Sequence, residues 1–363
     1  MSRVDVVVPS YNYSHYLRGC VESLFDQEGV DVRVLIIDDA STDDTPAQAA
    51  QLLIEYPGLE YRRHPQNIGH IATYNEGLLE WAAAPYVLLI SADDLLAPGA
   101  LRRAVEQMDR HYSIGMVCGM ALLFESWEHI ARAPIAKSSG SAAEPDTKIF
   151  PTDQFLRRCV QGNPIATPTV VVRTELQRSV GPYAPELPHS GDMEMWMRFA
   201  VRGEIAVTRF VQAYKRLHTG NMSKGYCALH DLRQRFEAIE YRCARDADTY
   251  ARYGLSREYV HRSMAEEALW VAYGFFDVGE RAAIRDCLQF ALEVWPSIAK
   301  STTWRRMQLK LRLGPRLTGR LRSIATVFRQ SPGAQTILDP RLGPRPGTIQ
   351  GWWPEHLNSS VAQ

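Results

Sequence analysis

The chain has 363 residues, in which 41 lysines and arginines balance 41 aspartates and glutamates. This length allows one large domain or two smaller ones with a buried core, and the balanced charge provides no general attraction to nucleic acid. The six cysteines lack the paired spacing of a zinc site. No signal-peptide pattern precedes the first apolar run, and no run reaches the roughly 18 residues of a membrane helix. We expect a cytoplasmic protein with reduced cysteines.

Short apolar runs and amphipathic segments alternate over the first hundred residues. The apolar runs predict strands within residues 4–12, 32–41, 59–64 and 87–94. Between them, apolar residues at helical spacing predict helices within residues 16–27, 41–53 and 67–82. Strands that alternate with helices in this way form a mainly parallel sheet with helices on both faces. The predicted fold class is therefore α/β.

Two of the predicted strands end in adjacent aspartates, which are rarely buried without a partner. Asp39 follows the second strand, and Asp93 and Asp94 follow the fourth. Ligands of open α/β sheets bind beyond the carboxyl ends of the strands, so these carboxylates are expected to reach a ligand crevice. Clustered carboxylates suit Mg²⁺, which fills its other positions with water and substrate phosphates. We predict a metal-bound diphosphate there, while a role in helix capping and loop hydrogen bonds stays open.

Further along the chain, residues 131–148 are rich in proline and small residues and predict a surface loop. Residues 169–173 predict a short strand. The segment 187–200 (LPHSGDMEMWMRFA) predicts a loop that enters a helix. Asp192 stands in the first turn of that helix, where the helix dipole stabilises an anion.

Six fragments of the sequence carry a resemblance to a known family. They are VVVPSYN, VLIIDDAST, NIGHIATYNEGL, LLISADD, GDMEMWMRF and RLHTGNMS. In their order and spacing, between residues 4 and 223, they resemble family-2 glycosyltransferases with the GT-A fold. The resemblance implies a GT-A domain over residues 1–225, with a mainly parallel sheet flanked by helices and followed by a helical C-terminal region.

The resemblance also implies a nucleotide pocket at the first strand ends. Pro9 and Tyr11 are similar to residues that contact the nucleobase. Asp39 matches the aspartate that accepts a hydrogen bond from a pyrimidine ring. Asn67 and Gly69 match the loop that lines the pocket. The implied donor is a UDP-sugar, with dTDP-sugars and GDP-sugars as alternatives.

A metal site is implied by the same resemblance. The family's metal motif is written Asp-x-Asp, and Asp93 stands at its last position as the expected ligand of Mn²⁺ or Mg²⁺. Ser91 occupies the first position, where the family has a carboxylate. Asp94 either takes over part of that role or caps the next helix. His218 matches the family's late histidine and is a further candidate ligand, with Lys215, Arg216 and Lys224 nearby to neutralise diphosphate charge.

The resemblance assigns the role of general base to Asp192. The family often has Glu-Asp at this point, whereas this chain has Gly191 before the aspartate. Glu194 either holds the general base in position or binds the acceptor. Arg198 follows it at the helical distance of four residues, so the two side chains are expected to pair.

The remainder of the chain is helical in pattern. Residues 226–300 include a segment that resembles a tetratricopeptide hairpin, and residues 301–363 form a basic, partly irregular tail. Between Lys300 and Arg329 the tail has no acidic residue and carries Arg305, Arg306, Lys310, Arg312, Arg316, Arg320 and Arg322. Such a segment either lies on an anionic membrane surface or forms a solvated helix face. Gly314 and Pro315 interrupt any single helix here.

The resemblance implies an inverting, metal-dependent glycosyltransferase of the hexosyltransferase type. It would move a sugar from a nucleotide-diphosphate donor to a glycan or lipid-linked acceptor, in polysaccharide or glycoconjugate synthesis. A nucleotidyltransferase would need a glycine-rich basic loop near the first strand, which VVVPSYNYSHY does not supply. A catalytically inactive nucleotide-sugar or glycan-binding module is the other alternative, because Ser91 and Gly191 replace family acids. A homo-oligomer is left open, and no nucleic-acid partner is expected.

Overall fold

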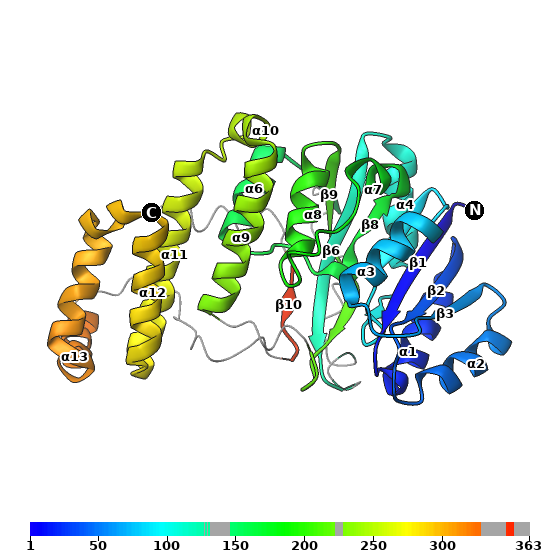
Figure 1. Ribbon diagram of the computed structural model, residues 1–363, viewed down its shortest axis with the longest axis horizontal. Helices are drawn as coiled ribbons and strands as arrows, with labels where there is room; N and C mark the ends of the chain where they lie inside the picture. Colours follow the sequence, from blue (N-terminus) through cyan, green and yellow to red (C-terminus); the bar gives the residue numbers. More distant parts are fainter. Residues whose placement is uncertain (127, 129, 131–145, 222–227, 328–345, 352–363) are drawn as a thin grey trace. The chain divides into compact units, whose positions relative to one another are not determined.

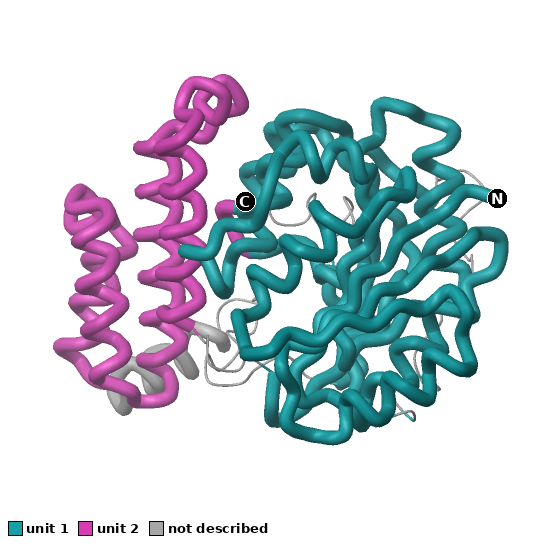
Figure 2. Tube along the Cα trace, turned by 45° about the vertical axis from the view of Figure 1, so that its right-hand side comes forward, with its two compact units in different colours: residues 1–159, 163–221, 344–363 teal, residues 160–162, 222–343 magenta. Residues whose placement is uncertain are grey.

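The computed structural model describes residues 1–126, 128, 130, 146–221, 228–327 and 346–351. The chain divides into two compact units, which Figure 2 distinguishes by colour. We call them the sheet unit (Met1–Cys159, Asn163–Asn221 and Pro344–Gln363) and the helical unit (Val160–Gly162 and Met222–Gly343). Most of the surface loop expected at residues 131–148 lies outside the described residues.

The sheet unit is built on one mixed sheet (Figure 1). Its strands are β1 (Arg3–Ser10), β2 (Asp31–Asp38), β3 (Leu59–Arg63), β4 (Tyr86–Leu89), β5 (Leu95–Leu96), β6 (Ile114–Phe124), β7 (Thr147–Phe150), β8 (Val171–Arg173), β9 (Glu204–Arg216) and β10 (Ile349–Gln350). They are ordered β3-β2-β1-β4-β8-β6-β9-β5, with β10 paired to β6 and β7 to β9. Strands β3, β2, β1 and β4 are parallel, whereas β8 is antiparallel to β4 and β6. The parallel half therefore delivers the carboxyl ends of β1, β2 and β4 to one edge.

Helices cover both faces of this sheet, because its central strands are apolar on both sides. On one face, the core includes residues of β1, α1 (Ser14–Phe25), α2 (Thr45–Glu55) and α4 (Ala100–Arg110). The other face carries α3 (His70–Asn75), the π-helix η1 (Glu76–Trp81), α7 (Thr174–Val180) and α8 (Gly191–Ala200). A Cβ added at Gly77 would lie 2.3 Å from a methyl carbon of Val7, so a glycine is needed for η1 to approach β1 this closely. This architecture confirms the predicted fold class.

The helical unit consists mainly of α9 (Leu229–Arg245), α10 (Ala247–Arg252), α11 (Arg257–Val278), α12 (Arg281–Val294), the 3-10 helix η4 (Pro296–Lys300) and α13 (Thr302–Val327). Helices α11 and α12 form a packed hairpin that turns at Gly279, whose φ of 84° is left-handed and favours glycine. Arg235 of α9 is buried and bonds the carboxylates of Asp231 and Glu267. A buried arginine needs such partners, since an unpaired charge there would be strongly destabilising.

Helix α13 is broken at Gly314, where φ is 76° and ψ is 165°. The break lies at the Gly314–Pro315 pair that the sequence marked as an interruption. Within the residues that the structure describes, no helix is both long enough and apolar enough to span a membrane.

Candidate functional site

The loops after β1 and β2 are tied together at the carboxyl edge of the sheet. The backbone N–H of Asn12 donates to Ser41 Oγ at 2.9 Å, and Asn12 Oδ1 accepts from the backbone N–H of Thr42 at 2.8 Å. Asn12 adopts a left-handed φ of 59°, which asparagine tolerates better than most residues. Of the two residues expected beside the nucleobase, Tyr11 is 45% exposed next to this junction and Pro9 is buried in β1.

Asp39 organises the segment that leads from β3 into α3. Its Oδ1 accepts from the backbone N–H of Ile68 at 2.8 Å, and its Oδ2 accepts from the backbone N–H of Gly69 at 2.9 Å. Asn67 Oδ1 lies 3.2 Å from the same Gly69 nitrogen. The structure therefore brings Asp39, Asn67 and Gly69 together. Gly69 has a φ of 87°, which suits glycine at the start of α3.

His64 is a member of this cluster that the sequence interpretation missed. Its Nδ1 lies 2.8 Å from Asp39 Oδ1, and its Nε2 lies 2.8 Å from Glu76 Oε2. Glu76 begins η1 and also pairs with Arg62 of β3 at 3.2 Å. No motif in the sequence marks His64, because its two carboxylate partners come from separate elements.

The acid pair Asp93–Asp94 follows β4 and meets the end of β9. Asp93 Oδ2 lies 2.9 Å from His218 Nε2 and 3.4 Å from Asn221 Nδ2. Asp94 Oδ1 accepts from the backbone N–H of Arg216 at 2.9 Å, which fixes β9 against the acid pair. Burial, followed by the charge of Asp93, raises the pKa of the Asp94 carboxyl well above its usual range. The Asp94 carboxylate is thus held in a setting that disfavours its negative charge.

This arrangement fits a cation bound by the Asp93 carboxylate. Asp93 Oδ1 is buried and has no hydrogen-bond partner in the part of the chain that the structure describes, and such a group is costly unless a ligand satisfies it. The described residues contain no cluster of three or more His, Cys, Asp or Glu side chains placed to hold a metal by themselves. A cation held by one or two carboxylates, with substrate phosphates completing the shell, requires no such cluster.

Aromatic side chains from α1 and the loop before it line the acid pair. The ring centroids of Tyr13 and Tyr16 lie 5.5 Å and 5.1 Å from that of His218. Burial, with the charges of Asp93 and Asp94, raises the pKa of the Tyr13 hydroxyl. The fragment YNYSHY, rich in rings directly after the first strand, was the signal for these residues.

Asp192 stands in the first turn of α8 and is half-buried. Its Oδ2 accepts from Asn163 Nδ2 at 3.0 Å and from Thr167 Oγ1 at 3.1 Å, and its Oδ1 accepts from the backbone N–H of Met193 at 2.6 Å. Burial raises the pKa of the Asp192 carboxyl, against the opposing effect of these hydrogen bonds and of the Lys215 charge. Asn163 and Thr167 were not predicted as site residues.

Two neighbours lie within electrostatic reach of both Asp192 and the acid pair. The pKa of Tyr74 is raised by burial and then by the charges of Asp192, Asp93 and Asp94. Lys215 of β9 lowers the pKa values of both Asp192 and Asp94 by its charge. The charged Lys215 side chain acts on both carboxyls and therefore lies within electrostatic reach of each.

Glu194 follows Asp192 in α8 but does not join the site. Its carboxylate is 1% exposed and pairs with Arg198 at 2.8 Å, as their spacing predicted. Arg198 also donates to the backbone carbonyls of Val180 and Pro182. The pair anchors α8 to the segment after α7, which holds Asp192 in place.

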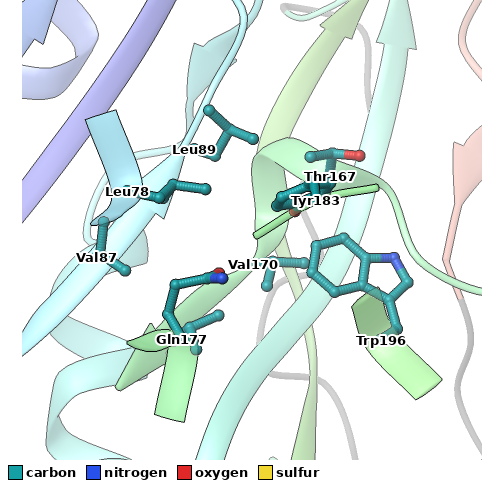
Figure 3. A pocket seen from close by; sticks show the side chains of 9 residues that line it. Leu78, Val87, Leu89, Thr167, Val170, Gln177, Tyr183 and Trp196 are labelled. Carbon is teal, nitrogen blue, oxygen red and sulfur yellow. The ribbon is translucent and has the colours of Figure 1, made fainter. Parts of the chain in front are cut away.

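A small pocket lies behind Asp192, between β4, β8 and the helices η1, α7 and α8 (Figure 3). It is lined mainly by apolar side chains, with Thr167, Gln177 and the ring of Trp196 facing it. The pocket has room for about one water molecule. It is therefore too small for a nucleotide sugar.

The fold and the site define an α/β domain with carboxylates at the carboxyl ends of parallel strands. Residues 5–165 match the family described as Glycosyl transferase family 2. The TarS 1-349 structure from S. aureus, in complex with UDP-GlcNAc, is 19% identical, has a TM-score of 0.54, and aligns with 86% of this chain and 92% of its own. Residues 5–165 therefore match a family-2 glycosyltransferase domain, and the structural likeness supports the GT-A fold, which confirms the recognition made from the motifs.

Curated relatives match this chain over parts of their length. An uncharacterized protein of Mycobacterium tuberculosis, MT1568, is 25% identical over 209 residues, which are 56% of this chain and 63% of that protein. The succinoglycan biosynthesis protein ExoO of Rhizobium meliloti is 34% identical over 106 residues, covering 29% of this chain and 30% of its own. The chondroitin synthase of Pasteurella multocida is 28% identical over 114 residues, which are 31% of this chain and 12% of the synthase.

Proposed function

We propose that this protein is an inverting, metal-dependent glycosyltransferase that uses a nucleotide-diphosphate sugar. The proposal rests on two carboxylates, those of Asp93 and Asp192, and on the surroundings that they share. A buried carboxylate oxygen of Asp93 lacks a partner within the described residues, and the half-buried Asp192 stands within electrostatic reach of the same site. The first feature suits a metal-bound diphosphate, and the second suits a general base.

In the proposed reaction, Asp93 and His218 would hold the cation, and Asp94 is a further candidate ligand. A bound Mn²⁺ or Mg²⁺ supplies positive charge that offsets the charge developing on the diphosphate leaving group. Asp192 accepts the proton of the acceptor hydroxyl as its oxygen attacks the anomeric carbon from the face opposite the diphosphate. Asn163 and Thr167 fix the carboxylate orientation for that transfer. Lys215 places a further positive charge between the two groups.

The nucleotide is proposed to lie over the loops after β1 and β2, with its base near Asp39. TarS 1-349 has been solved with UDP-GlcNAc and with UDP, which supports a UDP-sugar as the donor, with dTDP-sugars and GDP-sugars as alternatives. The acceptor is proposed to be a glycan or a lipid-linked glycan, since relatives bear names of polysaccharide synthesis, such as chondroitin synthase.

A panel of nucleotide sugars tests this proposal. A donor that binds only the folded chain raises its melting temperature, by an amount equivalent to about 2.7 kcal/mol at a hundred times its dissociation constant. We expect UDP-sugars to stabilise the protein in the presence of Mn²⁺ and to do so less when the metal is chelated. The stabilising donor is then offered with candidate acceptors. Stabilisation without turnover would favour the inactive binding module, and no stabilisation by any donor would contradict both functions.

Peripheral membrane contact is proposed through the surface of the helical unit around α13. Arg305, Arg306, Leu309 and Arg312 are exposed, and Leu309 is 56% exposed. The spacing of these four places them on one face of the helix. Side chains beyond residue 314 of this helix lie outside the described residues, so Arg316, Arg320 and Arg322 remain sequence predictions.

An exposed tryptophan extends this surface onto α11. The Lys310 Nζ lies 4.5 Å from the ring centroid of Tyr273, whose ring is 5.7 Å from that of Trp270. Trp270 itself is 60% exposed. A mixture of arginine, leucine and an exposed tryptophan is typical of segments that lie on anionic membranes.

Changing Arg305, Arg306 and Arg312 together to glutamine should weaken binding to anionic liposomes on the order of a hundredfold, at about 1 kcal/mol per basic residue. The measurement is sedimentation with anionic and neutral liposomes, at low and high salt, since salt screens such attraction. Glutamine at Arg252, Arg281 and Arg285, which are also exposed in the helical unit, is the matched control. Equal pelleting with both lipids, or with neither, would contradict membrane docking.

A further inference from the structure

We infer that His64 is a positioning residue for nucleobase recognition: held between Asp39 and Glu76, it orients the Asp39 carboxylate so that one acceptor position remains for a ring N–H of the donor's base. The inference rests on the proposed function, because it requires a nucleotide beside Asp39. It goes further by assigning a role to a histidine outside the motifs and by predicting which bases are accepted.

The first step is the number of hydrogen bonds that Asp39 already accepts. A carboxylate offers about four lone-pair positions on its two oxygens. Oδ1 receives the backbone N–H of Ile68 and faces His64 Nδ1, while Oδ2 receives the backbone N–H of Gly69. Among the described residues, these contacts leave one lone-pair acceptor position on Asp39 Oδ2. Any further donor to Asp39 must therefore approach that oxygen.

The second step is the protonation of His64. Both of its ring nitrogens face carboxylate oxygens at 2.8 Å, but a neutral imidazole carries only one N–H. Both contacts are hydrogen bonds only when the ring is protonated. Burial by itself lowers the pKa of His64, but the bonds to Asp39 and Glu76 outweigh it and raise the pKa above its ordinary value. The charged residues around the ring are Asp39, Glu76 and, through Glu76, Arg62.

The third step links this geometry to the base. The N3 position of uracil or thymine carries an N–H that can donate to the remaining position on Oδ2. Cytosine has an unprotonated acceptor at N3, so a fixed carboxylate there would face a lone pair and leave a buried polar group unsatisfied. When His64 loses its proton, one of its two contacts is lost. Asp39 is then held less firmly, and the preference for uracil weakens.

The experiment compares the affinities of UDP and CDP as a function of pH. The two nucleotides share the same diphosphate and ribose, so metal binding and phosphate ionisation cancel in the ratio of their dissociation constants. In the wild-type protein we expect UDP to be favoured by about tenfold or more near pH 6, as one hydrogen bond to a charged group allows. The ratio should fall as the pH rises through the raised pKa of His64, because the protonated ring is the form that holds Asp39.

Two variants separate positioning from general structural support. His64→Gln should bring the ratio close to one and remove its pH dependence. Glu76→Gln removes a carboxylate that raises the pKa of His64, so the fall in the ratio should move to lower pH while UDP preference persists in acid. His111→Gln, at an exposed histidine after α4, is the control and should behave as wild type.

The outcomes distinguish this inference from the proposed function. If UDP is preferred over CDP but His64→Gln leaves the ratio and its pH dependence unchanged, His64 has no positioning role. If wild type binds UDP and CDP equally at every pH, Asp39 does not recognise the base through this oxygen. If no nucleoside diphosphate binds at all, the proposed function itself is contradicted.

Discussion

Replacing Asp192 with asparagine is expected to lower the transfer rate by roughly two to four orders of magnitude, the usual contribution of a general base. Asparagine keeps an oxygen for the donors of Asn163 and Thr167, but it cannot take a proton from the acceptor. Donor affinity should stay close to that of wild type, because Asp192 faces the acceptor side of the proposed reaction. The measurement is kcat with saturating donor, together with a donor binding isotherm.

The pH profile gives the same prediction a second readout. Burial raises the pKa of the Asp192 carboxyl, so the base loses its activity on the acid side at a higher pH than an exposed aspartate would. We expect kcat of the wild type to fall as the pH drops through that raised pKa, and the residual rate of Asp192→Asn to lack this limb. A variant with near-normal turnover and an unchanged acid limb would remove Asp192 from the reaction.

Replacing Asp93 with asparagine should nearly abolish transfer and weaken metal-dependent donor binding. The amide carries no charge to hold a cation, yet its oxygen and nitrogen keep the size of the side chain, so the fold should persist. Titration of Mn²⁺ in the presence of UDP, followed by a spectroscopic signal of bound manganese, measures the loss directly. Metal affinity equal to that of wild type would show that Asp93 is not a ligand.

A matched variant of the second aspartate makes this test sharper. Asp94 Oδ1 accepts the backbone N–H of Arg216, and Asp94→Asn retains an oxygen for that bond. If Asp94 only anchors β9, this variant should bind Mn²⁺ nearly as well as wild type. If it loses metal as severely as Asp93→Asn, Asp94 is a second ligand that replaces the carboxylate missing at Ser91.

The sequence predicted the parallel half of the sheet because its signals are local. Buried strands and amphipathic helices alternate over short distances, and each can be recognised by its own periodicity. The start of the strand expected at residues 169–173 was predicted two residues too early. Strand β8 begins at Val171, and residues Thr167–Thr169 form a short 3-10 helix. Pro168 favours that turn, and a run of β-branched residues alone does not reveal where pairing with β4 starts.

In the site too, some residues could be predicted from the sequence and others could not. Asp39, Asp93 and Asp192 follow strands or begin a helix, so their positions could be predicted, and motif resemblance supplied their expected roles. The partners that orient them could not be predicted. His64 meets Asp39 from the residue after β3, and Asn163 and Thr167 reach Asp192 from a segment more than twenty residues earlier. Such contacts depend on how distant segments pack, which one sequence does not record.

The short strand β10 also bears on how the chain folds as it is synthesised. Ile349 pairs with Leu122 of β6, so this strand joins the sheet across roughly two hundred intervening residues that include the helical unit. Closing so long a loop carries an entropic cost and tends to be slow. The residues proposed for the base, the metal and the nucleobase precede Met222, whereas Lys224, expected near the diphosphate, lies outside the described residues. These earlier segments can therefore assemble while the helices are still being made, and strand β10 would then be added last, as a late step in forming the sheet.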